Sequence, residues 1–81
     1  MNITLYTTLG CHLCEQALQL LHEAEQTGAH IQVSEVEIAD SDDLMERYGI
    51  RIPVVADESG RELGWPFDLA TLNSFLETPG S

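Results

Sequence analysis

The two cysteines of this chain, Cys11 and Cys14, are the residues best suited to chemistry, and two residues separate them. Two thiols at this spacing can close a disulfide with each other, so the pair can release and take up two electrons. A Cys-x-x-Cys pair can also bind zinc, carry haem when a histidine follows directly, or form a purely structural disulfide. The surrounding residues distinguish these kinds of chemistry.

A closed zinc site needs four ligands, and besides the two cysteines the chain offers only His12, His22 and His30. His22 and His30 lie well beyond the pair and cannot complete a site with it locally. Haem attachment is excluded because Glu15 follows Cys14. A disulfide over so short a loop restricts the unfolded chain little, which weakens the purely structural interpretation. Redox chemistry is therefore the favoured prediction.

The pair stands where a predicted strand is followed by a predicted helix. Residues 2–7 contain β-favouring side chains, and apolar residues recur at spacings of three and four from about residue 11 to residue 26. The free amides and the positive dipole end of a helix N-terminus stabilise a thiolate. We therefore expect a lowered pKa for Cys11 and a nucleophilic role for it, while Cys14 resolves the mixed disulfide.

Three further strands are predicted, over residues 29–38, 50–56 and 61–64. The first of them breaks its apolar alternation once, between Val33 and Val36, which suggests a β-bulge. The second contains Pro53, which lacks the amide that a central strand needs. Its position is explained either by a cis Ile52–Pro53 peptide bond or by an ordinary trans proline in an edge strand.

Two more helices complete the pattern. One is predicted from the cap Ser41 to Gly49, and the last begins after the cap Asp68 and precedes a frayed tail over residues 78–81. The order strand, helix, strand, helix, strand, strand, helix predicts an α/β fold in which three helices cover a four-stranded mixed sheet. Eighty-one residues provide for one such domain, over residues 1–81.

The charge of the chain excludes several classes of partner. Fourteen acidic residues face three arginines and no lysine, so the formal net charge is −11. Nucleic acids and anionic membranes are therefore not expected as partners. Half of residues 35–46 are acidic, which is more typical of a solvated face than of a docking face for a basic partner. The chain shows no signal-peptide pattern and no long apolar run, and it has only two cysteines, so we expect it in the reducing cytoplasm. We also expect a monomer.

These features together resemble the glutaredoxins of the thioredoxin superfamily over nearly the whole chain. The likeness rests on the Cys-x-x-Cys helix start, on Ile52-Pro53 at the third strand, and on Gly64 before the last helix. The Thr-Thr-x-x-Cys-x-x-Cys start at residues 7–14 is similar to that of small bacterial glutaredoxin-like proteins. The resemblance implies a thioredoxin-like fold. It also implies a cis Pro53 that faces Cys11, and pairing of the Ile52 backbone with the substrate.

The chain departs from that family in three places. Glutaredoxins usually have Pro-Tyr between the cysteines, a lysine just upstream, and a Gly-Gly pair before the last helix. The corresponding residues here are His12-Leu13, Leu9-Gly10 and Gly64-Trp65-Pro66-Phe67. Because these departures affect the glutathione site, we expect no bound cofactor, and the reductant is left open between glutathione and a dithiol protein.

Beside the catalytic cysteines, we expect substrate contacts from His12, Leu13, Arg51, Ile52, Pro53 and Trp65. Protonated His12 could help to hold the Cys11 thiolate, or it could be an idle surface residue. Arg51 could meet a substrate carboxylate or pair with the acidic surface. Trp65 could line the rim of the site or pack in the core, whereas for Tyr6 we expect core packing.

The sequence thus predicts a thiol-disulfide oxidoreductase that acts on a disulfide-containing protein or on a small thiol substrate. The rival prediction is a binding module of the same fold. Such a module would use the Cys-x-x-Cys pair to hold copper or an iron-sulfur cluster, without redox turnover.

Overall fold

A computed structural model describes residues 1–77 of the chain. Its elements in chain order are β1 (Asn2–Thr7), α1 (His12–Gln26), β2 (Gln32–Glu37), the single 3-10 turn η1 (Ile38–Asp40), α2 (Asp42–Tyr48), β3 (Val54–Ala56), β4 (Glu62–Gly64) and α3 (Leu69–Glu77). The predicted order of strands and helices is confirmed. The predicted tail over residues 78–81 lies outside the described residues. Within residues 1–77, no helix is both long enough and apolar enough to cross a membrane.

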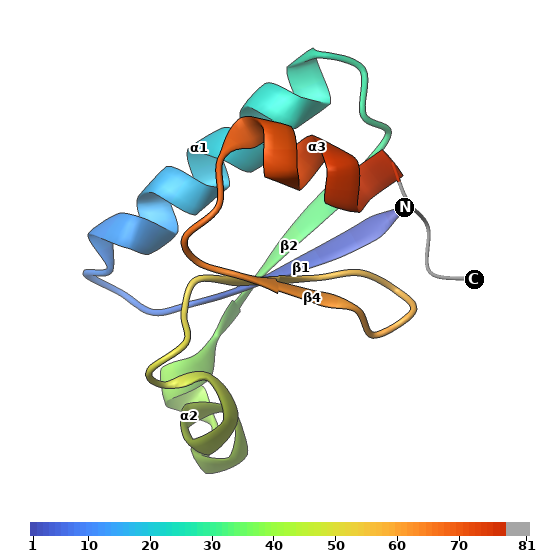
Figure 1. Cartoon of the computed structure of the whole chain (residues 1–81). Helices are drawn as coiled ribbons and strands as arrows, with labels where there is room; N and C mark the ends of the chain where they lie inside the picture. The colour runs from blue at the N-terminus through green and yellow to red at the C-terminus, as the bar shows by residue number, and fades with distance from the viewer. Residues whose placement is uncertain (78–81) are drawn as a thin grey trace.

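The four strands form one mixed sheet in the order β2-β1-β3-β4. Strand β1 runs parallel to β2 and antiparallel to β3, and β4 returns antiparallel to β3. Helices α1 and α3 cover one face of this sheet, and the short α2 lies on its other side near one end (Figure 1). Strand β1 is therefore central, and its carboxyl end delivers the chain to the Cys-x-x-Cys segment.

Alternate residues of the strands pack into two separate cores, as the period of two requires. Ile3, Leu5 and Val55 belong to the main core beneath α1 and α3. Their neighbours on the opposite face join a smaller core with α2, composed of Ile38, Tyr48 and Val54 with Tyr6, Leu44 and Ile52 packed against it. Core packing of Tyr6 is confirmed, since its ring stacks on that of Tyr48 with centroids 4.1 Å apart.

The helix caps follow the sequence prediction. The Ser41 hydroxyl accepts a hydrogen bond from the Leu44 amide at 3.3 Å, and the Asp68 carboxylate accepts one from the Thr71 amide at 2.8 Å. Each cap satisfies an amide that the first helical turn would otherwise leave unpaired. These caps fix where α2 and α3 begin.

The predicted bulge in β2 is wrong. Strands β1 and β2 pair without interruption, from Asn2 opposite Gln32 to Thr7 opposite Glu37. The slip in the apolar pattern arises because the segment serves both faces. Val33 packs against the main core, whereas Ile38, just after the strand, belongs to the smaller core.

The predicted strand over residues 50–56 is shorter than expected. Only Val54–Ala56 pair with the sheet, and Ile50 is fully exposed. The amides of Arg51 and Ile52 both donate to the carbonyl of Tyr48, at 2.8 and 3.0 Å, so they continue the end of α2 instead of joining the ladder. The start of β3 is thus set by the preceding helix.

Candidate active site

Cys11 and Cys14 form a disulfide at the N-terminus of α1, with their Cα atoms 5.2 Å apart. Cys11 is the N-cap residue, and its Sγ accepts a hydrogen bond from the Cys14 amide at 3.1 Å. Cys11 is half-buried, whereas Cys14 is only 3% exposed. In the reduced protein the same amide and the helix dipole would favour a thiolate at Cys11. The more exposed of the two cysteines is thus the one whose thiolate the helix would stabilise.

The loop before Cys11 is held by a residue that the sequence analysis did not single out. The Glu37 carboxylate accepts hydrogen bonds from the amides of Leu9 and Ala39, at 2.9 and 3.0 Å. The bond from Ala39, followed by one from Thr8, keeps the pKa of Glu37 below its usual value. Glu37 therefore ties the end of β2 to the turn that leads into the cysteines.

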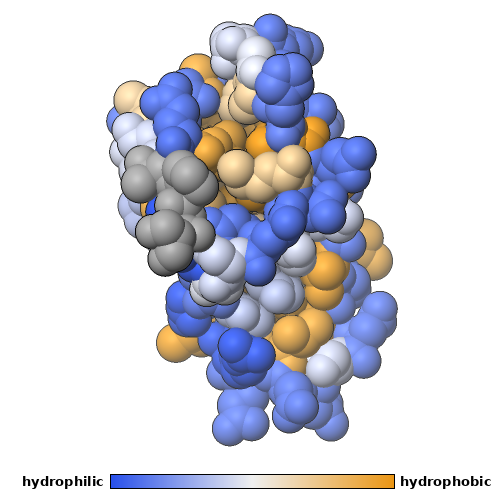
Figure 2. Space-filling view, turned by 90° about the vertical axis from the view of Figure 1, so that its right-hand side faces the viewer, coloured by the Kyte–Doolittle hydropathy of each residue, from blue (hydrophilic) through white to orange (hydrophobic). Residues whose placement is uncertain are grey.

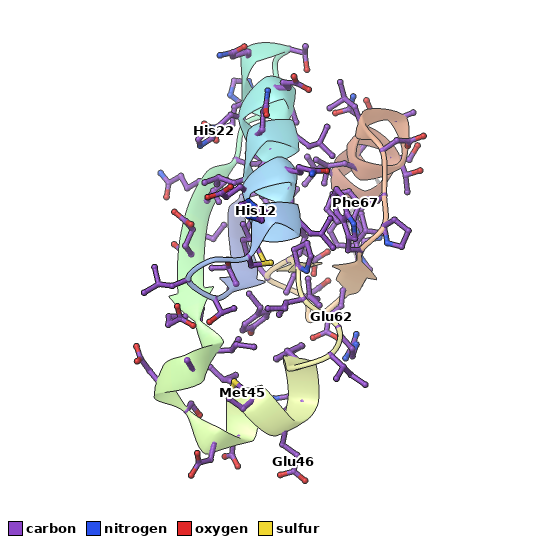
Figure 3. All side chains as sticks on the ribbon, turned by 90° about the vertical axis from the view of Figure 1, so that its left-hand side faces the viewer. His12, His22, Met45, Glu46, Glu62 and Phe67 are labelled. Atoms are coloured by element: carbon purple, nitrogen blue, oxygen red, sulfur yellow. A yellow bond between two sulfur atoms is a disulfide. The ribbon has the colours of Figure 1, made fainter. Side chains whose placement is uncertain are left out.

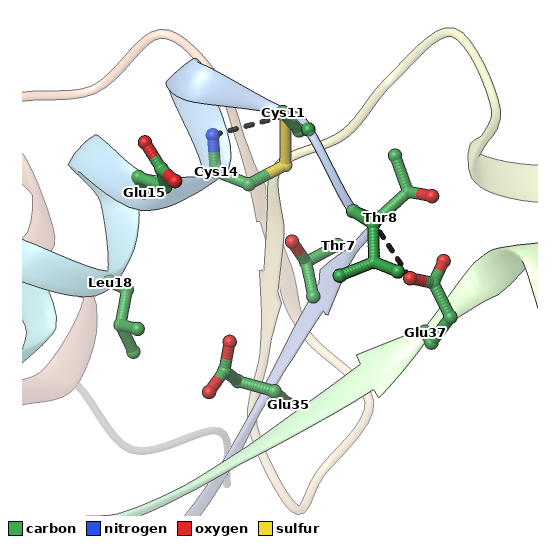
Figure 4. A pocket seen from close by; sticks show the side chains of 10 residues that line it. Thr7, Thr8, Cys11, Cys14, Glu15, Leu18, Glu35 and Glu37 are labelled. Atoms are coloured by element: carbon green, nitrogen blue, oxygen red, sulfur yellow. Dashed lines mark hydrogen bonds between the residues drawn. A yellow bond between two sulfur atoms is a disulfide. The ribbon is translucent and has the colours of Figure 1, made fainter.

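A groove of about 340 Å³ opens beside the disulfide, on the side of strand β2. Its lining comprises Thr7, Thr8, Leu9, Gly10, Cys11, Cys14, Glu15, Leu18, Glu35 and Glu37. Figure 4 shows Glu15 and Leu18 projecting from α1 and Glu35 and Glu37 from β2. A substrate that approaches the disulfide from this side would meet carboxylates from both walls.

Pro53 lies at the same end of the sheet as the cysteines. The register places Tyr6 opposite Val54, so Pro53 comes just before the strand position that faces the end of β1. The Ile52–Pro53 bond is cis, as the family resemblance implied, and the Pro53 carbonyl accepts the Trp65 amide at 3.0 Å. A direct contact between Pro53 and the Cys11 sulfur stays a prediction.

The segment before Pro53 is supported by a polar network around Tyr48. The Tyr48 hydroxyl donates to one Glu62 carboxylate oxygen at 2.5 Å, and Arg51 donates to the other at 3.2 Å. The bond to Glu62 raises the pKa of Tyr48 to about 12, and the same bond, with help from Arg51, lowers the pKa of Glu62. Arg51 thus forms the salt bridge that the sequence left open, and a role for it toward a substrate carboxylate stays a prediction.

Replacing Glu62 by glutamine should destabilise the protein by about 1 kcal/mol at neutral pH, because Arg51 and Tyr48 lose a charged acceptor that is partly solvent-screened. The folded-state pKa of Glu62 lies below its ordinary 4.5. The carboxylate therefore stabilises fully above pH 4.5, and its contribution is lost as the pH falls through the folded-state value.

The stability difference between the native chain and E62Q should thus shrink between roughly pH 5 and pH 3. Urea titrations at the two pH values measure it. E46Q, at an exposed position on α2, is the control and should differ little from the native chain at either pH. A stability difference between the native chain and E62Q that does not change with pH would contradict the stabilising role of the Glu62 carboxylate.

The other expected substrate contacts lie in different surroundings. The His12 side chain is 89% exposed, and its Nδ1 lies 3.5 Å from a Glu15 carboxylate oxygen. Leu13 is half-exposed beside the disulfide. Trp65 packs against the main core, with its ring edge-on to Phe67 at a centroid distance of 5.1 Å. Figure 3 shows His12 at the cysteine end of α1 and His22 further along the same helix.

A single-chain metal site would need several donor side chains close together. Across residues 1–77, no three His, Cys, Asp or Glu side chains gather closely enough to hold an ion. Beside the groove, the described residues offer two thiols and the carboxylates around them for chemistry.

Comparison with known proteins gives the relationship of the chain. A family model described as a glutaredoxin-like domain (DUF836) matches residues 2–77. The X-ray structure of target protein XcR50 from X. campestris is 41% identical, with a TM-score of 0.86 over 95% of this chain and 99% of that one. Its solution structure gives 43% identity and a TM-score of 0.80 over the whole of both chains. No curated protein matches the chain.

The architecture is shared more widely than the sequence. Thioredoxin 1 from Thermosipho africanus TCF52B superposes with a TM-score of 0.68 over 95% of this chain and 91% of that one, at 13% identity. At that identity the likeness concerns the fold alone. The expected thioredoxin-like fold is confirmed, and with the match over residues 2–77 the chain belongs to the glutaredoxin-like domain family.

Proposed function

We propose that this protein is a dithiol thiol-disulfide oxidoreductase, with Cys11 as the nucleophile and Cys14 as the resolving thiol. One observation carries the proposal: the Cys11 sulfur caps α1 and receives the Cys14 amide at 3.1 Å, beside an open groove. A sulfur in that position is poised to ionise and to be reached. Cys14, buried one helical turn further on, is protected from outside disulfides and lies within bonding distance of Cys11.

The reaction starts from the reduced protein. The Cys11 thiolate attacks one sulfur of a substrate disulfide, so a Cys11–substrate bond forms and the substrate S–S bond breaks. The first substrate thiolate leaves and takes up a proton from water. Cys14 then loses its proton, attacks the Cys11 sulfur and expels the second substrate thiolate. The substrate gains two electrons and the protein ends as the Cys11–Cys14 disulfide, which an external thiol reductant must reduce again.

The test separates turnover from metal storage. Protein purified without oxygen should contain less than one equivalent of copper, iron or zinc, and its two thiols should be oxidised by a neutral small disulfide and restored by dithiothreitol. Stoichiometric metal, held by both cysteines and blocking that oxidation, would favour the binding module and contradict the proposal.

Reduction by glutathione is expected to be slow and to speed up with added salt. Glutathione is an anion at neutral pH, and the carboxylates that line the groove repel it, as does the net charge of −11. Salt screens this repulsion, with a Debye length of about 10 Å at 0.1 M, so a severalfold rise in rate is expected between about 0.02 and 0.3 M salt.

The measurement follows reduction of the oxidised protein by glutathione across a salt series at fixed pH. Dithiothreitol is uncharged at neutral pH and serves as the control, whose rate should hardly change with salt. A fast reaction with glutathione that slows as salt is added would mean that a local positive pocket outweighs the acidic surface.

A further inference from the structure

The edge strand β2 carries acidic residues on the sheet face where apolar residues are expected. Parallel pairing places Val33, Glu35 and Glu37 opposite Ile3, Leu5 and Thr7, so all three lie on the face of the main core. Val33 packs there, but Glu35 is exposed and Glu37 half-buried. Acidic residues at positions that the alternation reserves for the core point to a function. Both line the groove beside the disulfide.

The described residues neutralise only a small part of the negative charge in the groove. Three carboxylates and no basic side chain line it. Glu37 is engaged by backbone amides, and Glu15 meets only the exposed His12 at 3.5 Å. The Glu35 carboxylate makes no hydrogen bond or ion pair with any residue of the described range 1–77, although its backbone pairs with β1.

The basic residues of the chain are placed elsewhere. Arg51 pairs with Glu62, and Arg61 pairs with Asp57 at 2.8 Å. Arg47, the third, lies over the Tyr48 ring at 5.2 Å. Since the chain has no lysine and its arginines lie elsewhere, His12 is the basic side chain that the described residues place at a groove carboxylate, and a permanently charged cation there would come from the substrate.

Apolar side chains flank the same site. Leu9, two residues before Cys11, is 92% exposed, and Leu13, two residues after it, is 45% exposed. Large apolar residues left in water next to a reactive sulfur favour contact with a polypeptide over contact with a small ion. Figure 2 views the opposite side of the molecule, where hydrophobic patches lie among hydrophilic side chains.

We propose that the groove receives a basic protein segment, and that the preferred substrate is a protein disulfide with lysine or arginine side chains next to the reacting cysteine. This inference rests on the proposed oxidoreductase function and adds its substrate class. The lysine or arginine would lie between Glu15 and Glu35, while neighbouring substrate residues contact Leu9 and Leu13.

The test uses the full reduced chain and three disulfide-linked peptides that differ only in whether lysine, glutamine or glutamate flanks the cysteine. Each rate constant is divided by that of the same peptide with dithiothreitol, which removes differences in intrinsic reactivity. At low salt the lysine peptide should react about tenfold faster than the glutamine peptide, and the glutamate peptide more slowly still. At high salt the normalised rate constants of the three peptides should lie within about twofold of one another.

Matched variants separate the groove from the overall charge. E15Q/E35Q removes two carboxylates from the groove, and E25Q/E46Q removes two exposed ones from the far end of α1 and from α2. Glu37 is kept because it holds the loop before Cys11. The lysine preference should fall to about twofold in E15Q/E35Q and persist in E25Q/E46Q. Equal losses in both variants would assign the preference to net charge and overturn the proposal.

Two more measurements complete the test. Cystamine, a small cationic disulfide, should react more slowly than the lysine peptide after the same normalisation, and an equal rate would overturn the assignment of a protein segment. Failure to reduce even the glutamine peptide would instead refute the oxidoreductase function itself. The two proposals therefore fail in distinguishable ways.

Discussion

Replacing Cys11 by serine is expected to lower disulfide reduction by about a thousandfold or more, because the nucleophile is lost. A serine hydroxyl stays protonated at neutral pH even at a helix N-terminus. Replacing Cys14 by serine should have a different effect, since Cys11 can still attack but the mixed disulfide cannot be resolved. C14S is therefore the matched control at the other end of the same disulfide.

Mass spectrometry of the intact proteins distinguishes the two variants. After exposure to a small disulfide, C14S should gain the mass of one half of that disulfide, whereas C11S should remain largely unmodified. The modification of C14S should proceed well below the pH at which an ordinary cysteine reacts, because the N-cap position stabilises the thiolate. Faster modification of C11S than of C14S would reverse the assigned roles.

Replacing Leu72 by alanine is expected to destabilise the protein by about 3 kcal/mol, the middle of the range for a leucine removed from a packed interior. Leu72 lies in α3 with none of its surface exposed, inside the main core. A domain of this size has only about 5 kcal/mol of total stability. Most of that margin should therefore be lost.

Urea denaturation followed by circular dichroism measures this loss as a lower midpoint with an unchanged slope. S74A, an exposed substitution on the same helix, is the control and should stay within about 0.5 kcal/mol of the native chain. An L72A midpoint equal to that of S74A would mean that α3 contributes little to the core.

Local signals in the sequence account for most of the architecture. The caps Ser41 and Asp68 accept the amides expected of them, and the Cys-x-x-Cys pair stands at the helix start that the apolar spacing predicted. These features depend on residues within a few positions of one another. Short-range chemistry of this kind is visible in one sequence without knowledge of the fold.

The acidic side of the groove escaped prediction because it depends on partners distant in the sequence. Glu35 and Glu37 looked like part of a solvated acidic run, and only the pairing of β2 with β1 brings them beside the cysteines. Alternation with Val33 is the signal that could have placed them on that face. The start of β3 was missed for a different, local reason: the Tyr48 carbonyl accepts the amides of Arg51 and Ile52, and the apolar run over residues 50–56 gives no sign of this.

The position of β2 at the sheet border also affects how copies of the protein meet. A border strand presents unpaired amides and carbonyls, which invite a strand from another chain and hence aggregation. The other border, β4, is only three residues long, whereas β2 has six. Charged side chains on such a strand hinder this association. Glu35 and Glu37 would therefore hinder the pairing of this border strand with a strand from another chain, whatever they contribute beside the disulfide.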